Sequence, residues 1–166
     1  WSAIDLDRDG FLNEREWAFF RTRSASRNGL LAVKLGGNGD VTNTHVLWRF
    51  EKSLPDVSSP LVYNGVVFLF RNGGIATTLN ARTGEPLKQA RLTGALEDYY
   101  ASPIGVDDKV YIASEHGKVV VLRAVGNWEV LAINEFESDI YATPAVSESQ
   151  MYIRTQNALY AIGSFN

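Results

Sequence analysis

The chain has 166 residues, with 16 basic and 19 acidic side chains, a net charge of −3 and 45% apolar residues. This charge balance excludes the excess of lysine and arginine that is typical of a nucleic-acid-binding protein. The apolar fraction excludes a disordered chain. No apolar stretch approaches the roughly 18 residues that a membrane-spanning helix needs. Because the sequence contains no cysteine, it can form neither a disulfide nor a zinc–thiolate site.

The first motif in chain order is an acidic loop at residues 5–16, with the sequence DLDRDGFLNERE. Its spacing matches the twelve-residue calcium loop of an EF-hand, which supplies oxygen ligands from alternate positions and a closing glutamate. Gly10 stands where that loop makes its sharp turn. The expected calcium ligands are Asp5, Asp7, Asp9, the backbone carbonyl of Phe11, Asn13 through a water, and a bidentate Glu16.

A helix is expected to leave this loop, from Asn13 to about Arg23. We interpret residues 1–26 as a calcium-binding insertion in the repeat array that follows. The alternative is an acidic turn that caps a helix, but a random turn of this kind rarely has both the glycine and the final glutamate in register. Since calcium sensors use paired EF-hands and no second loop occurs here, we expect a structural ion rather than a switch.

Residues 27–166 contain a repeat. Pro60, Pro103 and Pro144 lie 43 and 41 residues apart, and each begins a short apolar strand, a polar turn and a β-rich strand. A period near 40–45 residues with four strands per unit is typical of a β-propeller. A β-sandwich would share the alternation of apolar residues but would not explain two such similar spacings.

We therefore predict an all-β fold, a partial β-propeller of four-stranded antiparallel blades, with a small α-helical EF-hand segment at the N-terminus. Two blades are expected to be complete. One partial blade has two strands, Leu30–Leu35 and His45–Phe50, and another has three strands after Pro144. The clearest unit has four strands, Ala101–Val106, Lys109–Ser114, Lys118–Ala124 and Glu129–Phe136.

The segment from Gly74 to Leu87, GIATTLNARTGEPL, resembles the repeat of bacterial pyrroloquinoline-quinone-like (PQQ-like) propeller proteins. That repeat has a glycine turn, an apolar strand and then Asp-x-x-Thr-Gly-Glu. Asn80 replaces the aspartate here, and the usual tryptophan is replaced near Lys88. The resemblance implies a periplasmic or secreted location. An incomplete ring implies, as partners, the missing blades of a parent chain or a second copy of this chain.

The resemblance favours a non-enzymatic binding or scaffold module with structural calcium. The alternative is a fragment of a PQQ-dependent quinoprotein dehydrogenase, but those enzymes typically have an adjacent cysteine pair and stronger tryptophan motifs. This chain has neither, so we do not expect it to bind PQQ or to be an enzyme by itself. A third hypothesis, a calcium sensor with the propeller as its partner surface, lacks the second EF-hand.

Five residues just before the repeated prolines are candidate ligand-binding residues: Asp98, Tyr99, Tyr100, Asp139 and Tyr141. They lie where connections between blades ring one mouth of a propeller channel, and carboxylates with aromatic rings there could bind a protein or a small polar ligand. The alternative is that these tyrosines pack between blades. His116 is expected to be exposed to solvent in a turn rather than catalytic.

Overall fold

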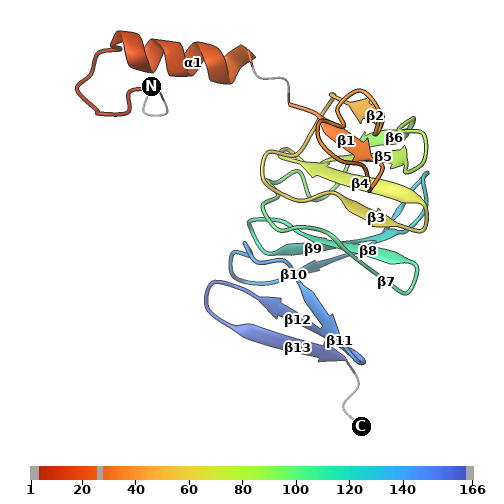
Figure 1. The fold of residues 1–166 in the computed structure, drawn as a ribbon. Helices are drawn as coiled ribbons and strands as arrows, with labels where there is room; N and C mark the ends of the chain where they lie inside the picture. Colours follow the sequence, from red (N-terminus) through yellow and green to blue (C-terminus); the bar gives the residue numbers. More distant parts are fainter. Residues whose placement is uncertain (1–3, 26–27, 164–166) are drawn as a thin grey trace.

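A computed structural model describes residues 4–25 and 28–163, which form one helix and thirteen strands (Figure 1). The helix is α1 (Glu14–Ala25). The strands are β1 (Leu30–Val33), β2 (Val46–Phe50), β3 (Leu61–Tyr63), β4 (Val66–Arg71), β5 (Ile75–Asn80), β6 (Pro86–Arg91), β7 (Ile104–Val106), β8 (Lys109–Ala113), β9 (Lys118–Arg123), β10 (Val130–Glu135), β11 (Ala145–Ser147), β12 (Gln150–Arg154) and β13 (Leu159–Gly163). In the described part of the chain, no helix is long and apolar enough to cross a membrane.

The strands form separate antiparallel sheets in chain order. β1 pairs with β2, β3 to β6 form a four-stranded meander, β7 to β10 form a second one, and β11 to β13 form a three-stranded sheet. Figure 1 shows these sheets stacked one after another, with α1 apart from them. The predicted partial propeller of four-stranded antiparallel blades is confirmed, and the β-sandwich alternative is wrong. The predicted boundary between residues 26 and 27 lies outside the described residues.

Strand β4 shows how the sheets stack. Its residues alternate between two cores: Val66, Phe68 and Phe70 pack toward the sheet β7–β10, whereas Val67 and Leu69 pack toward β1 and β2. All five are buried, because a sheet lies on each face of this strand. The uninterrupted apolar run VVFLF is therefore the sequence of a strand covered on both faces.

Glycines allow aromatic side chains to cross from one sheet to the next. The Trp48 ring lies against Gly84, where an added Cβ would come within 2.6 Å of it, and its indole N–H donates a hydrogen bond to the Ala81 carbonyl at 3.1 Å. Tyr63 lies against Gly105 in the same way, again at 2.6 Å from a Cβ placed there. Because glycine has no side chain, each aromatic ring lies directly against the backbone of the neighbouring sheet.

The first strand of the sheet β7–β10 is shorter than expected. β7 begins at Ile104 rather than at Ala101, since the preceding proline has no N–H with which to pair. The residues before the prolines instead join successive blades. The Ser59 amide donates a hydrogen bond to Ser102 Oγ at 2.9 Å, and the Ser102 amide donates one to Thr143 Oγ1 at 3.0 Å. The repeated step therefore occupies equivalent places in successive blades.

Candidate functional site

The loop at residues 5–16 folds around its acidic side chains. Asp5 and Glu16 are buried, with 5% and 2% of their surfaces exposed. The Asp5 carboxylate accepts hydrogen bonds from the Asp9 and Gly10 amides, at 3.2 and 3.0 Å. Gly10 adopts a φ of +86°, as the sharp turn at this position requires. Backbone donors thus hold the loop closed around Asp5.

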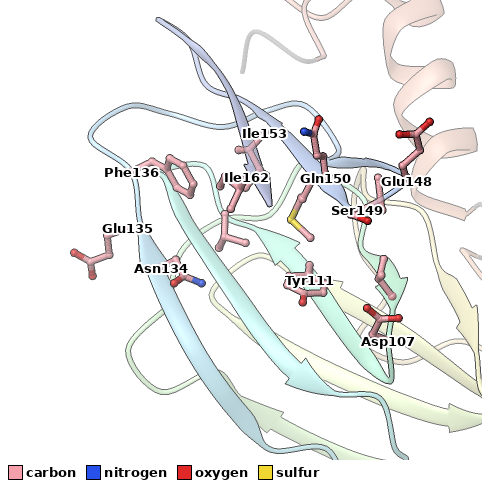
Figure 2. A pocket seen from close by; sticks show the side chains of 14 residues that line it. Asp107, Tyr111, Asn134, Glu135, Phe136, Glu148, Ser149, Gln150, Ile153 and Ile162 are labelled. Atoms are coloured by element: carbon pink, nitrogen blue, oxygen red, sulfur yellow. The ribbon is translucent and has the colours of Figure 1, made fainter. Parts of the chain in front are cut away.

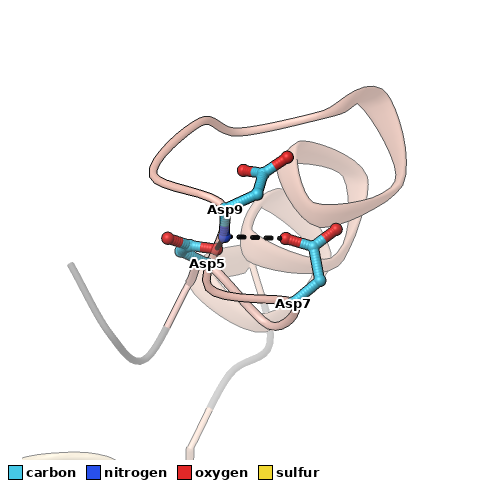
Figure 3. A group of neighbouring side chains, drawn as sticks. All are labelled: Asp5, Asp7 and Asp9. Carbon is cyan, nitrogen blue, oxygen red and sulfur yellow. Dashed lines mark hydrogen bonds between the residues drawn. The ribbon is translucent and has the colours of Figure 1, made fainter.

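Three carboxylates gather within this loop. Asp5, Asp7 and Asp9 each place one oxygen within 4.8 Å of the others (Figure 3). A hydrogen bond from the Asp9 amide lowers the pKa of Asp7, but desolvation and the charges of Asp9, Glu16 and Asp5 outweigh it, so the pKa is raised overall. A bound cation would relieve this repulsion, and calcium prefers hard oxygen ligands of this kind.

Glu16 closes the loop and also begins the helix. Its two carboxylate oxygens accept hydrogen bonds from the Asn13 amide at 3.0 Å and the Leu6 amide at 2.7 Å, and these bonds lower its pKa. The Glu16 amide donates in return to Asn13 Oδ1 at 3.1 Å, which makes a capping box at the start of α1. The helix-cap interpretation therefore describes the same side chains. Oε2 accepts one hydrogen bond and keeps a lone pair for a cation, whereas Oε1 accepts bonds from both the Leu6 and the Asp7 amides, so a bidentate ion would have to displace the longer of these, the 3.3 Å bond from Asp7. The Phe11 side chain is exposed and has no ligand atom, so only the Phe11 backbone carbonyl could bind the ion.

The second group of predicted site residues lies in the connections between sheets. Residues 98–100 lie between β6 and β7, and residues 139–141 lie at the equivalent place between β10 and β11. The structure brings the rings of Tyr100 and Tyr141 together, with their centroids 5.8 Å apart. The two connections thus meet at one edge of the stacked sheets.

The turn between β8 and β9 adds two residues to this site: Glu115, which the sequence analysis missed, and His116, which it expected only to be exposed in a turn. The Tyr141 hydroxyl donates a hydrogen bond to Glu115 Oε1 at 2.8 Å, and His116 Nδ1 lies 3.4 Å from Asp139 Oδ1. The bond to Glu115 raises the pKa of Tyr141 to about 12, and the bond to Asp139 raises the pKa of His116. His116 is exposed, as expected. We call Tyr100, Glu115, His116, Asp139 and Tyr141 the acidic–tyrosine cluster.

Asp98 and Tyr99 support this edge rather than facing the cluster. Tyr99 is 1% exposed, and its hydroxyl donates a hydrogen bond to the Ala95 carbonyl at 2.7 Å. The Asp98 carboxylate accepts a bond from the Gly73 amide at 3.2 Å. The packing role that we considered for the tyrosines therefore describes Tyr99. Adjacent residues of one connection point in different directions.

The cluster is held in place by ionic and backbone contacts. Glu97 Oε1 lies 3.0 Å from Lys118 Nζ, and Glu97 Oε2 accepts a hydrogen bond from the Ser114 hydroxyl, so both ends of the β8–β9 turn are fixed. The Glu115 amide donates to the Asp98 carbonyl at 2.8 Å. These contacts position the turn against the preceding connection before any ligand binds.

The cluster has a negative local potential. The charge of Glu115 is the main cause that raises the pKa of Tyr100, followed by desolvation and the charges of Asp98 and Asp56. Tyr141 is 51% exposed, so an incoming group can reach the ring. Carboxylates beside an accessible aromatic ring can bind a cationic group through charge-assisted hydrogen bonds and cation–π contact.

Comparisons with known proteins agree with this fold. Residues 21–164 match the protein family described as "Outer membrane protein assembly factor BamB". The structure is similar to BamB from Moraxella catarrhalis, with 18% identity and a TM-score of 0.64, over 82% of this chain and 40% of that chain. This chain thus spans about two fifths of the length of that structure. No curated protein matches it.

Two designed proteins are also similar. The computationally designed Ika4 protein has 14% identity and a TM-score of 0.58, over 75% of this chain and 76% of that chain. The computationally designed Ika8 protein has 15% identity and a TM-score of 0.55, over 70% of this chain and 36% of that chain. Identities this low indicate a shared fold and nothing about activity.

Proposed function

Because the chain belongs to the family of the outer membrane protein assembly factor BamB, we propose that it is a non-enzymatic β-propeller module that binds a protein partner. The acidic–tyrosine cluster carries this proposal, since it is an exposed polar site built by repeated connections of neighbouring blades. Connections displayed on rigid sheets commonly hold binding residues. The family name also supports a location outside the cytoplasm.

The partner should present a lysine or arginine side chain to the cluster. Glu115 and Asp139 supply carboxylates, and Tyr100 and Tyr141 supply ring faces. Arginine fits this combination best, because its planar guanidinium can make paired hydrogen bonds to a carboxylate and also stack on an aromatic ring. The attraction should weaken as salt is added, since the cluster is exposed.

Calorimetric titration with a tetra-arginine peptide tests this function. The wild-type protein should bind the peptide saturably, and the double variant Glu115→Gln/Asp139→Asn should bind it at least about tenfold more weakly, because two charges that face the ligand are lost. The matched control Glu14→Gln/Glu85→Gln removes the same charge at exposed positions away from the cluster. Equal binding by the cluster variant and the wild type would overturn the proposal.

The loop at residues 5–16 supports a second element of the function, a structural calcium ion. Three observations favour it: the gathered carboxylates of Asp5, Asp7 and Asp9, the burial of Glu16 and the turn at Gly10. The ion would also use the Phe11 carbonyl and, through a water, Asn13. Its role would be to fix this loop at the start of α1, since a cation that binds only the folded loop stabilises it by mass action.

The quinoprotein alternative has no specific support among the described residues. It requires a pocket for PQQ that several blades assemble, and it stays the alternative to a binding module. The two partners expected from the incomplete ring, further blades or a second copy, stay predictions.

A further inference from the structure

The carboxylate of Asp139 has a different neighbour at each of its oxygens. Oδ1 lies 3.4 Å from His116 Nδ1, and Oδ2 accepts a long hydrogen bond from the Tyr141 hydroxyl at 3.5 Å. The same hydroxyl makes its shorter bond, at 2.8 Å, to Glu115 Oε1. Within the acidic–tyrosine cluster, only His116 can carry a positive charge. This histidine is therefore the one cluster residue that can pair with a carboxylate as a cation does.

The backbone of the β8–β9 turn holds His116 beside Asp139. The Glu115 carbonyl accepts a hydrogen bond from the Ile140 amide at 2.9 Å, which ties the residue before His116 to the connection that carries Asp139. The residue after it, Gly117, has a φ of +84° and lies against backbone carbonyls just after β10, which leave no room for a Cβ. The His116 side chain is 65% exposed, so its ring exchanges protons freely with the solvent.

Three carboxylates act on His116, each from a different segment. Asp139 lies on the β10–β11 connection, Glu115 on the turn itself and Glu97 on the β6–β7 connection. The nearby cation, Lys118, is already paired with Glu97, with its Nζ 3.0 Å from Oε1. The hydrogen bond to Asp139 is the main cause that raises the pKa of His116. Desolvation opposes it, and the charges of Glu115, Asp139 and Glu97 add to it. This environment favours the protonated histidine.

Protonation of His116 changes the cluster in two ways. The imidazolium forms a charge-assisted hydrogen bond with Asp139 Oδ1 and so holds an oxygen that a guanidinium needs for a paired contact. It also cancels one of the two carboxylate charges of the cluster. The Tyr141 hydroxyl takes no part, because its bond to Glu115 raises its pKa to about 12. The change near neutral pH thus falls on His116, since histidine ordinarily titrates between about pH 5 and 8.

We infer that protonated His116 occupies Asp139 in place of the partner's cationic group, so that the acidic–tyrosine cluster binds its partner at higher pH and releases it as this histidine becomes protonated. The inference rests on the proposed function and adds its regulation. A neutral His116 leaves Oδ1 with only a neutral hydrogen bond, which a guanidinium can replace. Because the proton and the partner compete, each weakens the binding of the other by the same factor.

A second acidic set on these sheets has no histidine. Asp107 and Glu148 line the groove between the sheet β7–β10 and the sheet β11–β13 (Figure 2). Asp107 lies before β8, whereas His116 lies after it, so the two are at opposite ends of this strand. Neither of the chain's two histidines lines the groove. The double variant Asp107→Asn/Glu148→Gln is therefore the control for a cationic peptide that binds to acidic side chains in general.

Calorimetric titration of the whole chain with tetra-arginine at about pH 5.5 and about pH 8, at one ionic strength, tests the inference. The wild-type protein should bind the peptide about three- to fivefold more tightly at the higher pH, as expected for one exposed charge pair. His116→Gln keeps a neutral polar side chain, so this variant should bind equally well at both pH values. His45→Gln removes the other histidine. This variant and Asp107→Asn/Glu148→Gln should both keep the wild-type pH dependence.

A second measurement follows His116 itself. In an NMR titration of the wild-type protein, saturating tetra-arginine should lower the pKa of His116, since binding of the peptide and protonation of the ring oppose one another. The peptide should leave the ring signals of His45 unchanged at each pH, because His45 lies outside the cluster.

The possible results separate this inference from the proposed function. Saturable binding with equal affinity at both pH values, or a pH dependence that persists in His116→Gln, would overturn the inference and leave the cluster as a binding site. An unchanged pKa of His116 in the complex would do the same. No saturable binding of tetra-arginine by the wild-type protein at either pH would overturn the proposed function and the inference with it.

Discussion

Gly105→Ala tests whether neighbouring blades pack through the contact between β3 and β7. A methyl group at this position would lie 2.6 Å from Cγ of Tyr63, which is closer than nonbonded carbon atoms tolerate. The φ of Gly105 is outside the left-handed region, so the substitution adds no backbone strain of that kind. Overpacking of such a contact costs about 1–3 kcal/mol of unfolding free energy.

A double-mutant cycle isolates this contact. Tyr63→Ala removes the ring, so in that background Gly105→Ala should be nearly neutral, with a coupling free energy of about 1–3 kcal/mol. Gly36→Ala is the control, because Gly36 has a φ of +95° and nothing within 4 Å of an added Cβ. It should destabilise the fold by about 1–2 kcal/mol through backbone strain alone, with or without the Tyr63 ring.

Urea unfolding followed by tryptophan fluorescence measures each free energy. The expected result is strong coupling between Tyr63 and Gly105 and additivity between Tyr63 and Gly36. If Gly105→Ala destabilised the protein equally with and without the Tyr63 ring, the two sheets would not pack through this contact.

Three other predictions concern the sites. Asp139 raises the pKa of His116, so the stability that this pair contributes is present at low pH and is lost as pH rises through the raised pKa. NMR titration of the Asp139→Asn variant should therefore find a lower pKa for His116 than in the wild type. An unchanged pKa would contradict the contact between the two side chains. Calcium should bind to the wild-type protein in a calorimetric titration. Glu16→Gln should weaken calcium binding at least about tenfold, whereas the control Glu14→Gln should not. Absence of heat and of any change in Tm at millimolar calcium would mean that the loop does not bind calcium. The chain should not reduce an artificial electron acceptor when PQQ and an alcohol or aldose are added, and PQQ-dependent reduction would establish the quinoprotein alternative.

The sequence predicted the fold well where one local pattern repeats. The prolines at 43- and 41-residue spacing indicated successive blades, and the apolar run after each indicated strands. Strand ends were less predictable, as at β7, which begins only after Pro103 because the proline has no N–H with which to pair. The calcium ligands follow from spacing within one loop, and calcium binding itself stays a prediction.

The acidic–tyrosine cluster was only partly predictable. Tyr100 and Tyr141 stand at equivalent places in two repeats, which was visible in the sequence. Glu115 was missed, since it lies in a turn 26 residues before Tyr141. His116 in the same turn was expected to be exposed, but its contact with Asp139 was not predicted. Tyr99 was included with its neighbours because sequence does not show which way a side chain in an irregular connection points. Its ring lies in the core.

The most direct test of the central claim, that the acidic–tyrosine cluster is a binding site, is an NMR titration of the wild-type protein with tetra-arginine. The amide and ring signals of Tyr100, Glu115, His116, Asp139 and Tyr141 should shift together and saturate at one affinity, while signals of β13 stay unchanged. Shifts spread over all acidic surfaces without saturation, or shifts that leave these five residues unaffected, would contradict it.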